Sequence, residues 1–344
     1  MLNKAPYFSR LSACFVVISF LPFAVALRGG IKIVQKVIKD NNPHRTRQIN
    51  KVIDYIHEHM DGDLSVGALA GRADMSTYHF VRVFREQMGE TLARYVTRRR
   101  LELAAALLLG DEGIPVSEVA YRCGFASPNV FCRNFKARFG VTAQQYRSSK
   151  VQPDSKNRPS ERTDSHAPRS YSKYFCSRKT IKTGEKMMDC TFEIKDLPGF
   201  RVIYCRHYGA LDQMEGAFER LLQWAYPRGL VTAPGMQLLS VYHDNPEVTP
   251  TEKLTADAAM TVPGDVRTDG EIGQYEVSGG KYAVGRFEIG MEEFPDAWRA
   301  MFRLLEEHGC RCTEKHHYEI YRNNRDEHPQ RKWVVDICIP VELK

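Results

Sequence analysis

The chain has 344 residues, of which 43% are hydrophobic and 26% charged, a composition typical of globular proteins and long enough for two domains. Its net charge of +7 is unevenly divided: the balance is +6 in residues 1–45, +4 in 46–150, +5 in 151–188 and −8 in 189–344. The basic residues 1–188 favour a polyanionic partner, whereas the acidic residues 189–344 would repel one. The nine Cys are scattered without a CxxC pair, which argues against a disulfide framework and indicates reduced thiols.

Residues 1–45 contain an unexpected hydrophobic segment. Its 17 uncharged residues, LSACFVVISFLPFAVAL at 11–27, follow two cations and end in small residues, as in an export signal. Export conflicts with the intracellular partner that residues 46–148 predict, and a span of this length interrupted by Pro22 is short for a membrane. Three interpretations stay open: export, membrane association through residues 11–27, and a start codon placed too far upstream. We favour the last, which predicts a cytoplasmic protein located at the nucleoid.

Residues 46–148 predict an all-α domain that contains one duplicated unit. The stretch TRQINKVIDYIHEHM repeats its apolar residues at helical spacing. Two short helices at 65–73 and 77–87 follow, and a long helix at 92–109 then exposes Arg98, Arg99 and Arg100. A second pair of helices occupies 116–122 and 128–139. At an offset of 51, Ser76, Phe80, Arg82 and Phe84 recur as Ser127, Phe131, Arg133 and Phe135.

Each pair, two helices joined by a short turn, is a helix-turn-helix, whose second helix can enter the major groove of DNA. The serines are placed to cap the second helices, and the phenylalanines point to one side. The other side carries Tyr78, Val81, Arg82 and Arg85 in the first copy, and Asn129, Arg133 and Lys136 in the second. Arginine can pair with guanine, asparagine with adenine, and the remaining cations with phosphates. A single basic helix is most often only a solvated face, but the duplication favours double-stranded DNA as partner.

The stretch SEVAYRCGFASPNVFCRNFKARFGVTAQQYR resembles the signature of the AraC/XylS family of bacterial transcription regulators, and the resemblance covers residues 46–148. It implies two helix-turn-helix units held by a central helix, with both second helices in successive major-groove segments on one face of the DNA. It also implies RNA polymerase as a partner. By the family pattern the base-facing residues are Tyr78, Val81 and Arg82, followed by Pro128, Asn129 and Arg133. Apolar Val81 and Pro128 depart from the polar residues common at those positions.

Residues 149–188 are polar and basic, and therefore predict a flexible linker. Residues 189–344 contain a second duplication, in which helices at GAFERLLQWAYPRGL and DAWRAMFRLLEEHGC align at an offset of 80. Downstream, Tyr242 and Asp257 recur as Tyr321 and Asp336 at an offset of 79. Each copy predicts strand, helix, strand and strand. Two copies can form one antiparallel sheet with both helices on one face, an α+β domain.

One carboxylate breaks the symmetry of this duplication. Glu319 and Tyr321 lie on one face of a predicted strand, where the first copy has Ser240 and Tyr242. An acid present in only one copy indicates a site instead of a requirement of the fold. Together with Trp298, the two tyrosines could form aromatic walls for a cation. Aromatic residues at these spacings belong to a core more often than to a pocket, and Glu319 could simply pair with Arg322.

The stretches FEIKDLPGFRVIYCRHYGALDQMEGAFERLLQWA, YEIYRNN and HPQRKWVVDICIPV resemble the GyrI-like effector domains, over about 155 residues. The resemblance implies a groove between helices and sheet that binds a small molecule, often cationic or aromatic, with its carboxylate at the strand of Glu319. We expect no enzymatic activity and no cofactor. Two alternatives stay open for this domain: a hydrolase of reactive small molecules, and a module that binds gyrase or another protein. The cysteines and histidines at 310–317 match no common zinc spacing, so we expect no metal site.

Overall fold

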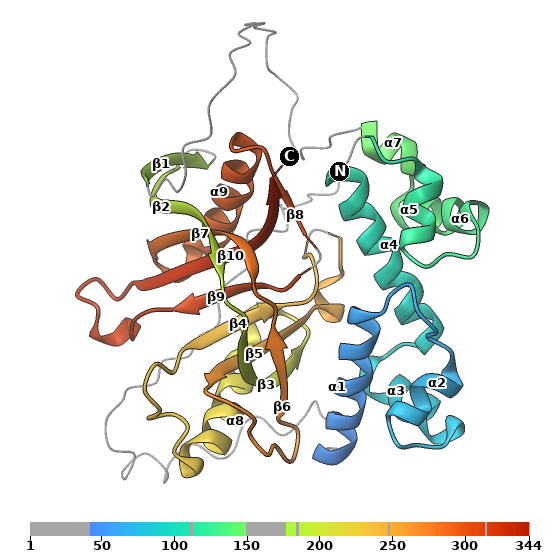
Figure 1. Ribbon diagram of the computed structural model, residues 1–344, viewed down its shortest axis with the longest axis horizontal. Coiled ribbons are helices and arrows are strands. Elements are labelled where there is room, and N and C mark those ends of the chain that lie inside the picture. The colour runs from blue at the N-terminus through green and yellow to red at the C-terminus, as the bar shows by residue number, and fades with distance from the viewer. Residues whose placement is uncertain are drawn as a thin grey trace, which may run out of the picture. The chain divides into compact units, whose positions relative to one another are not determined.

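The computed structural model describes residues 42–110, 113–148, 177–183, 186–246, 248–313 and 315–343. These residues form two compact units, an all-helical one that starts at Ile53 and one built on a β-sheet, with which residues 43–52 group (Figure 1). The fold class predicted from the sequence is thereby confirmed. The hydrophobic segment at 11–27 lies outside the described residues, so its three interpretations stay predictions. None of the described helices is both long and apolar enough to cross a bilayer.

The helical unit follows the predicted order of two short pairs around one long helix. Its helices are α1 (Pro43–Glu58), α2 (Val66–Arg72), α3 (Thr77–Met88), α4 (Leu92–Gly110), α5 (Val116–Arg122), α6 (Pro128–Phe139) and α7 (Ala143–Ser148). Helix α1 begins before the predicted residue 46, because the Asn42 side chain accepts a hydrogen bond from the backbone N–H of His44 at 3.1 Å. The proline at the first helical position suits a helix start, since its missing N–H would have no partner there.

The two copies build the same helix joint. Ser76 accepts a hydrogen bond from the backbone of His79, and Ser127 accepts one from Val130, so both predicted caps are confirmed. Phe131 and Phe135 of α6 are fully buried and belong to a core cluster with the second half of α4. In the first copy, Phe84 packs edge-on against Tyr95 of α4, with ring centroids 5.6 Å apart. Helix α4 is therefore the support on which both second helices pack.

The expectation that Arg98, Arg99 and Arg100 are exposed on α4 is wrong. Arg98 is only 9% exposed, and all three guanidinium groups are engaged within the helical unit. Helical periodicity places these side chains away from the apolar stripe, but it does not reveal that carboxylates and a carbonyl from other segments face them. Their partners are described below.

The second unit is an antiparallel sheet with two long helices. Its strands are β1 (Ser177–Thr183), β2 (Lys186–Leu197), β3 (Phe200–Tyr208), β4 (Leu238–Tyr242), β5 (Thr255–Val262), β6 (Gly273–Val277), β7 (Gly280–Ile289), β8 (Cys310–Cys312), β9 (His317–Tyr321) and β10 (Trp333–Leu343). Helix α8 (Glu215–Ala225) follows β3, and α9 (Phe294–Glu307) follows β7. The strand order is β1-β2-β7-β10-β9-β4-β5-β3-β6, with β8 paired to β10 (Figure 1).

The sheet begins earlier than the sequence predicted. Strand β1 and the first residues of β2 fall within 149–188, the predicted linker, and the two strands pair from Ser177↔Phe192 to Thr183↔Lys186. Strand β1 is an edge strand, and its sequence, SRKTIKT, has no apolar stripe that would have predicted it. The rest of the predicted linker, residues 149–176, lies outside the described residues.

The two copies exchange their first strands across the sheet. Strand β2, which precedes β3 of the first copy, pairs with β7 of the second, whereas β6 precedes β7 and pairs with β3. At the centre, β4 of one copy pairs with β9 of the other, which sets Ser240 opposite Glu319. The predicted repeat is thus present, and the exchange adds a strand to each side that the sequence offsets did not reveal.

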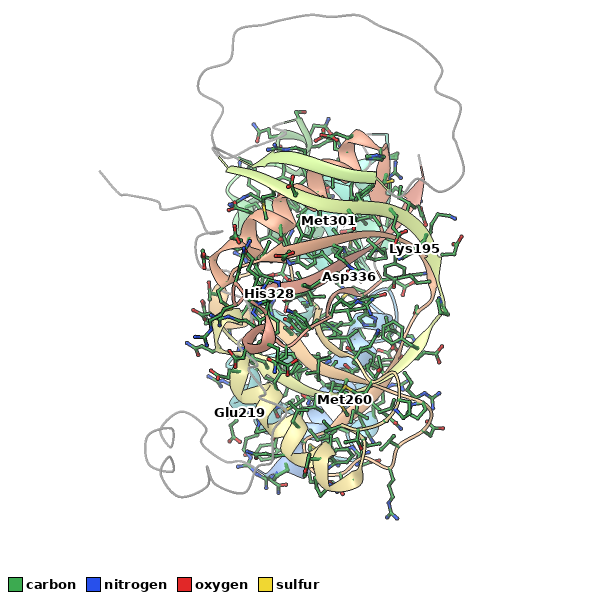
Figure 2. All side chains as sticks on the ribbon, turned by 90° about the vertical axis from the view of Figure 1, so that its left-hand side faces the viewer. Lys195, Glu219, Met260, Met301, His328 and Asp336 are labelled. Atoms are coloured by element: carbon green, nitrogen blue, oxygen red, sulfur yellow. The ribbon has the colours of Figure 1, made fainter. Side chains whose placement is uncertain are left out.

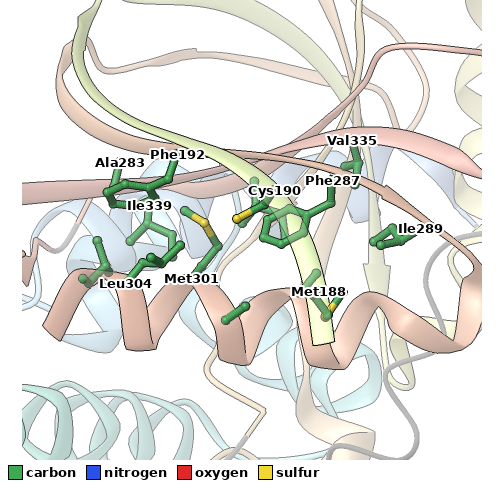
Figure 3. Close-up of a cluster of buried hydrophobic side chains, with 14 of the residues drawn as sticks. Met188, Cys190, Phe192, Ala283, Phe287, Ile289, Met301, Leu304, Val335 and Ile339 are labelled. Carbon is green, nitrogen blue, oxygen red and sulfur yellow. The ribbon is translucent and has the colours of Figure 1, made fainter. Parts of the chain in front are cut away.

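Both helices cover the same face of the sheet, as predicted. Helix α9 packs Met301 and Leu304 against strands β2, β7 and β10 (Figure 3). Helix α8 covers β3 and β5 in a second cluster that includes Met260, whereas Met301 marks the cluster under α9 (Figure 2). Tyr321 of the central strand β9 borders both clusters. The centre of the sheet, between the two helices, is consequently where the predicted effector residues lie.

Candidate functional site

The outer side of α3 carries the four residues that the sequence assigned to DNA. Tyr78 is 83% exposed and Val81 40%, while Arg82 and Arg85 also face solvent. The guanidinium of Arg82 lies 3.6 Å from the Glu86 carboxylate, an exposed pair one helical turn apart. Such a pair contributes little in water and can exchange for a base or a phosphate. The helix thus presents a mixed aromatic and cationic surface opposite its buried phenylalanines.

Helix α6 presents the equivalent surface of the second copy. Asn129, Arg133 and Lys136 are exposed, whereas Pro128 is half-buried at the first helical position. Val130 is 38% exposed beside Asn129 and was not among the predicted residues. Nothing in the apolar pattern marks it, because a valine at that position suits a core as well as a thymine methyl group.

The structure brings together all four residues predicted for the effector site. Glu319 of β9 is 1% exposed and accepts three hydrogen bonds. The indole N–H of Trp298 on α9 donates to Oε1 at 2.5 Å. The hydroxyls of Tyr242 and Tyr321 donate to Oε2 at 2.9 and 3.1 Å. The indole and the Tyr242 ring stand edge to face at 5.5 Å, so the carboxylate lies among half-buried aromatic side chains.

The carboxylate of Glu319 is buried without a countercharge. Its three donors are neutral, and within the described part of the chain no cation pairs with it. Burial raises the pKa of Glu319 to about 7, against the opposing effect of the hydrogen bonds from Trp298, Tyr242 and Tyr321. An ionised carboxylate in such a site is costly to the fold.

The equivalent positions of the two copies carry different residues at the site. Ser240, the counterpart of Glu319, is fully buried, and its hydroxyl lies 2.8 Å from the hydroxyl of Tyr321. Phe218, the counterpart of Trp298, has no donor and contacts Tyr321 edge-on. At these two described positions, the second copy has an acid and an indole that binds it, where the first copy has Ser240 and Phe218. Ser240 was not among the residues that the sequence assigned to the site, although the 79-residue offset aligned it with Glu319.

The opposite face of the sheet carries two equivalent carboxylate–arginine clusters. Asp257 on β5 binds Arg206 through two hydrogen bonds of 2.7 Å, and both side chains are fully buried. Asp336 on β10 binds Arg286 at 2.6 Å and Arg322 at 2.7 Å, with Arg286 half exposed. Arg322 therefore pairs with Asp336, and the alternative that it neutralises Glu319 is wrong. The first cluster thus sets one carboxylate against one guanidinium, and the second sets one carboxylate against two.

Two family models match the chain, one for each unit. Residues 69–149 match a helix-turn-helix domain, and residues 191–342 match the GyrI-like small molecule binding domain. A DNA gyrase inhibitor of Escherichia coli strain K12 is 30% identical over 158 residues, which are 44% of this chain and 94% of that protein. The multiple antibiotic resistance protein MarA of the same strain is 30% identical over 109 residues, 31% of this chain and 84% of the relative.

Among solved structures, the DNA-binding domain of the transcriptional factor AdpA, in complex with a target DNA, is 32% identical. The match covers 30% of this chain and 91% of that one, with a TM-score of 0.29. The chain is a DNA-binding transcription regulator of the helix-turn-helix class. It belongs to the AraC-type regulators and carries a C-terminal GyrI-like domain.

Proposed function

We propose that this regulator reads one asymmetric DNA site with α3 and α6, and that a small aromatic cation bound at Glu319 alters its effect on transcription. The observation that carries the effector half is the buried carboxylate with three neutral donors and no countercharge. A ligand cation would supply the missing charge, and the half-buried rings of Trp298, Tyr242 and Tyr321 would contact its apolar part. Such regulators act in the cytoplasm, where the DNA is.

In this proposal the two exposed helix surfaces divide the reading of DNA. Arg82 and Arg133 contact guanines, and Asn129 contacts an adenine. Arg85 and Lys136 hold phosphates, which positions the helices without reading sequence. Tyr78, Val81 and Pro128 make apolar contacts with base edges. Two helices in successive turns of one groove predict two boxes whose centres are about 10 bp apart.

Effector binding changes transcription only if the ligand prefers one of two states of the protein. We propose that the two states differ in their contact with RNA polymerase at the promoter. The GyrI-like domain lies after the DNA-binding domain in the chain, separated by residues 149–176, which leaves length for such a change.

Binding of benzyltrimethylammonium to the full chain tests the effector site. All three tryptophans, at 224, 298 and 333, lie in the GyrI-like domain, so their fluorescence reports on this domain alone. We expect the cation to bind at pH 8, where Glu319 with its pKa of about 7 is ionised. Below pH 7 the affinity should fall by about tenfold per pH unit, because the proton competes with the cation. Benzyl alcohol, which has no charge, should bind weakly and independently of pH.

The variant Glu319→Gln is the matched control for this prediction. It should lose the cation and the pH dependence while it retains the fold. Because the folded-state pKa of Glu319 is raised from 4.5, its contribution to stability is present below pH 4.5 and is lost as pH rises through about 7. The variant should therefore unfold no more easily than the parent at pH 8. Equal affinity for the charged and neutral probes would refute the cation site.

Two other outcomes would redirect the assignment. Hydrolysis of a reactive small molecule by the parent, absent in Glu319→Gln, would make the buried acid a catalytic group. Capture of gyrase that survives Trp298→Ala would favour a protein partner, as the name of the Escherichia coli relative suggests.

A further inference from the structure

We propose that Glu102 is a positioning residue that fixes the distance between the two recognition helices, and thereby the spacing of DNA boxes that the protein accepts. This inference rests on the proposed reading of DNA by α3 and α6. Glu102 lies near the middle of α4, away from the exposed helix surfaces that face DNA in that proposal, and is 6% exposed. Its role would be to act through other side chains.

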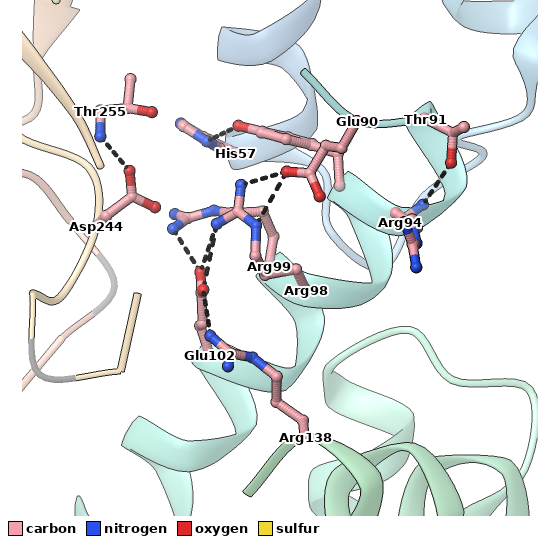
Figure 4. A network of polar contacts seen from close by, with 11 residues as sticks. His57, Glu90, Thr91, Arg94, Arg98, Arg99, Glu102, Arg138, Asp244 and Thr255 are labelled. Atoms are coloured by element: carbon pink, nitrogen blue, oxygen red, sulfur yellow. Dashed lines mark hydrogen bonds and ion pairs between the residues drawn. The ribbon is translucent and has the colours of Figure 1, made fainter. Parts of the chain in front are cut away.

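Glu102 is the centre of a charged network that reaches both helix-turn-helix units (Figure 4). Its carboxylate accepts hydrogen bonds from Arg98 at 3.2 Å and from Arg99 at 3.1 Å, both on α4. Arg98 also binds Glu90, which lies directly after the first recognition helix, at 3.0 Å. Arg138, in the last turn of the second recognition helix, lies 4.0 Å from Glu102. One turn of α4 thus links the ends of α3 and α6.

A second link lies on the opposite side of α4. Residue 100 is displaced by about 200° around the helix from residue 98, because successive residues turn by about 100°. Arg100 donates two hydrogen bonds, of 3.1 and 3.0 Å, to the carbonyl of Met60, which precedes the first helix-turn-helix. Gly124, in the turn of the second unit, approaches so closely that a Cβ there would lie 2.5 Å from that carbonyl and 2.7 Å from the guanidinium. The two helix-turn-helix units therefore contact the same turn of α4 on two opposite sides.

The electrostatics of the network make Glu102 the side chain on which it depends. Its carboxylate is shared by the guanidinium groups of Arg98, Arg99 and Arg138, and the first two are at most 13% exposed. Charge pairs at low exposure are weakly screened by salt and require close geometry. Without this carboxylate Arg99 and Arg138 lose the acid that they share on α4, whereas Arg98 keeps its pair with Glu90. The ion pair between α6 and α4 would then be lost, and the packing of α6 against α4 tolerates small rotations.

The test compares the affinity of the full chain for duplexes that differ only in box spacing. We use the site selected by the parent protein, and the same site with one base pair added or removed between the boxes. One base pair rotates a box by about a tenth of a helical turn, so the parent should lose about 10- to 100-fold in affinity. Glu102→Gln should bind all three duplexes within about threefold of one another. Arg138→Gln should act in the same direction from α6, at a side chain that is 31% exposed.

The ratio of the affinities for the three spacings distinguishes a positioning role of Glu102 from a role in stability or in phosphate contacts. A loss of stability or of a phosphate contact lowers all three affinities alike and leaves this ratio unchanged. Leu108→Ala, which removes a fully buried side chain from the core between α4 and the second unit, destabilises the same region. It should keep the spacing preference of the parent, as should Glu118→Gln, which breaks an exposed ion pair on α5. If Glu102→Gln and Arg138→Gln both kept the spacing preference, or if Leu108→Ala lost it, the inference about Glu102 would be wrong and the proposed function would stand. Failure of the parent to bind any specific site would instead overturn the proposed function as well.

Discussion

Replacement of both Arg82 and Arg133 by alanine is expected to abolish sequence-specific binding. Each bidentate contact with a guanine contributes about 1–3 kcal/mol of discrimination, so the double variant should lose about 2–6 kcal/mol. The two side chains lie on different recognition helices, in the same place of each copy, and their losses should be close to additive. Binding to non-specific DNA should fall far less, because Arg85 and Lys136 remain to hold phosphates. Fluorescence anisotropy with a specific and a scrambled duplex measures both affinities.

Arg122→Ala is the control for these arginines. Arg122 is exposed on α5, outside the recognition helices, and pairs with Glu118 at 2.9 Å. Its replacement removes the same charge and should lower both affinities alike, if at all. If Arg82→Ala and Arg133→Ala also weakened both duplexes by the same factor, their role would be limited to phosphates.

Asp257→Ala is expected to destabilise the GyrI-like domain by about 3–5 kcal/mol, because it leaves the buried Arg206 without its counterion. Tyr275 and His243 would also lose a partner, since both lie within 3.2 Å of the Asp257 carboxylate. Urea denaturation followed by tryptophan fluorescence observes this domain alone. Asp336→Ala, at the equivalent position of the other copy, should cost less because the half-exposed Arg286 can turn to water. Equal losses in both variants would contradict the assignment of the cost to burial.

The same pair predicts a pH dependence. Burial opposes ionisation of Asp257, but the charges and hydrogen bonds of Arg206 and His243 outweigh it and lower the pKa below the ordinary 3.8. A lowered pKa in the folded state contributes stability that is present above pH 3.8 and is lost as the pH falls further. The loss of stability between pH 4 and pH 2 should therefore be smaller in Asp257→Ala than in the parent. A parallel decline in the two proteins would refute this linkage.

The sequence predicts the features that occur in both copies of each repeat, because a residue type found at the same place in both copies indicates its role there. The alignment of Ser76 with Ser127 and of Arg82 with Arg133 predicted both caps and both exposed cations. The same comparison isolated Glu319 against Ser240, and the structure pairs these two residues across β4 and β9. In each case the period of the element decides which face a side chain occupies, and periodicity is visible in sequence.

The features that the sequence did not predict depend on contacts between segments that are distant in the chain. The arginines of α4 were expected in water, yet Glu90, Glu102 and the carbonyl of Met60 meet them. The edge strand β1 has no apolar pattern of its own, and its pairing with β2 is not visible in the sequence. The exchange of first strands likewise follows from register across the sheet, which repeat offsets do not encode.

Selection of binding sites from random duplexes by the full chain tests the central claim most directly, that one chain reads two boxes with two recognition helices. We predict enrichment of one asymmetric site with two boxes about 10 bp apart, recovered equally by monomeric protein. Loss of sequence information in one box for Arg82→Ala and in the other for Arg133→Ala would assign each box to its helix. A palindromic site, or enrichment of no sequence by folded protein, would contradict the account.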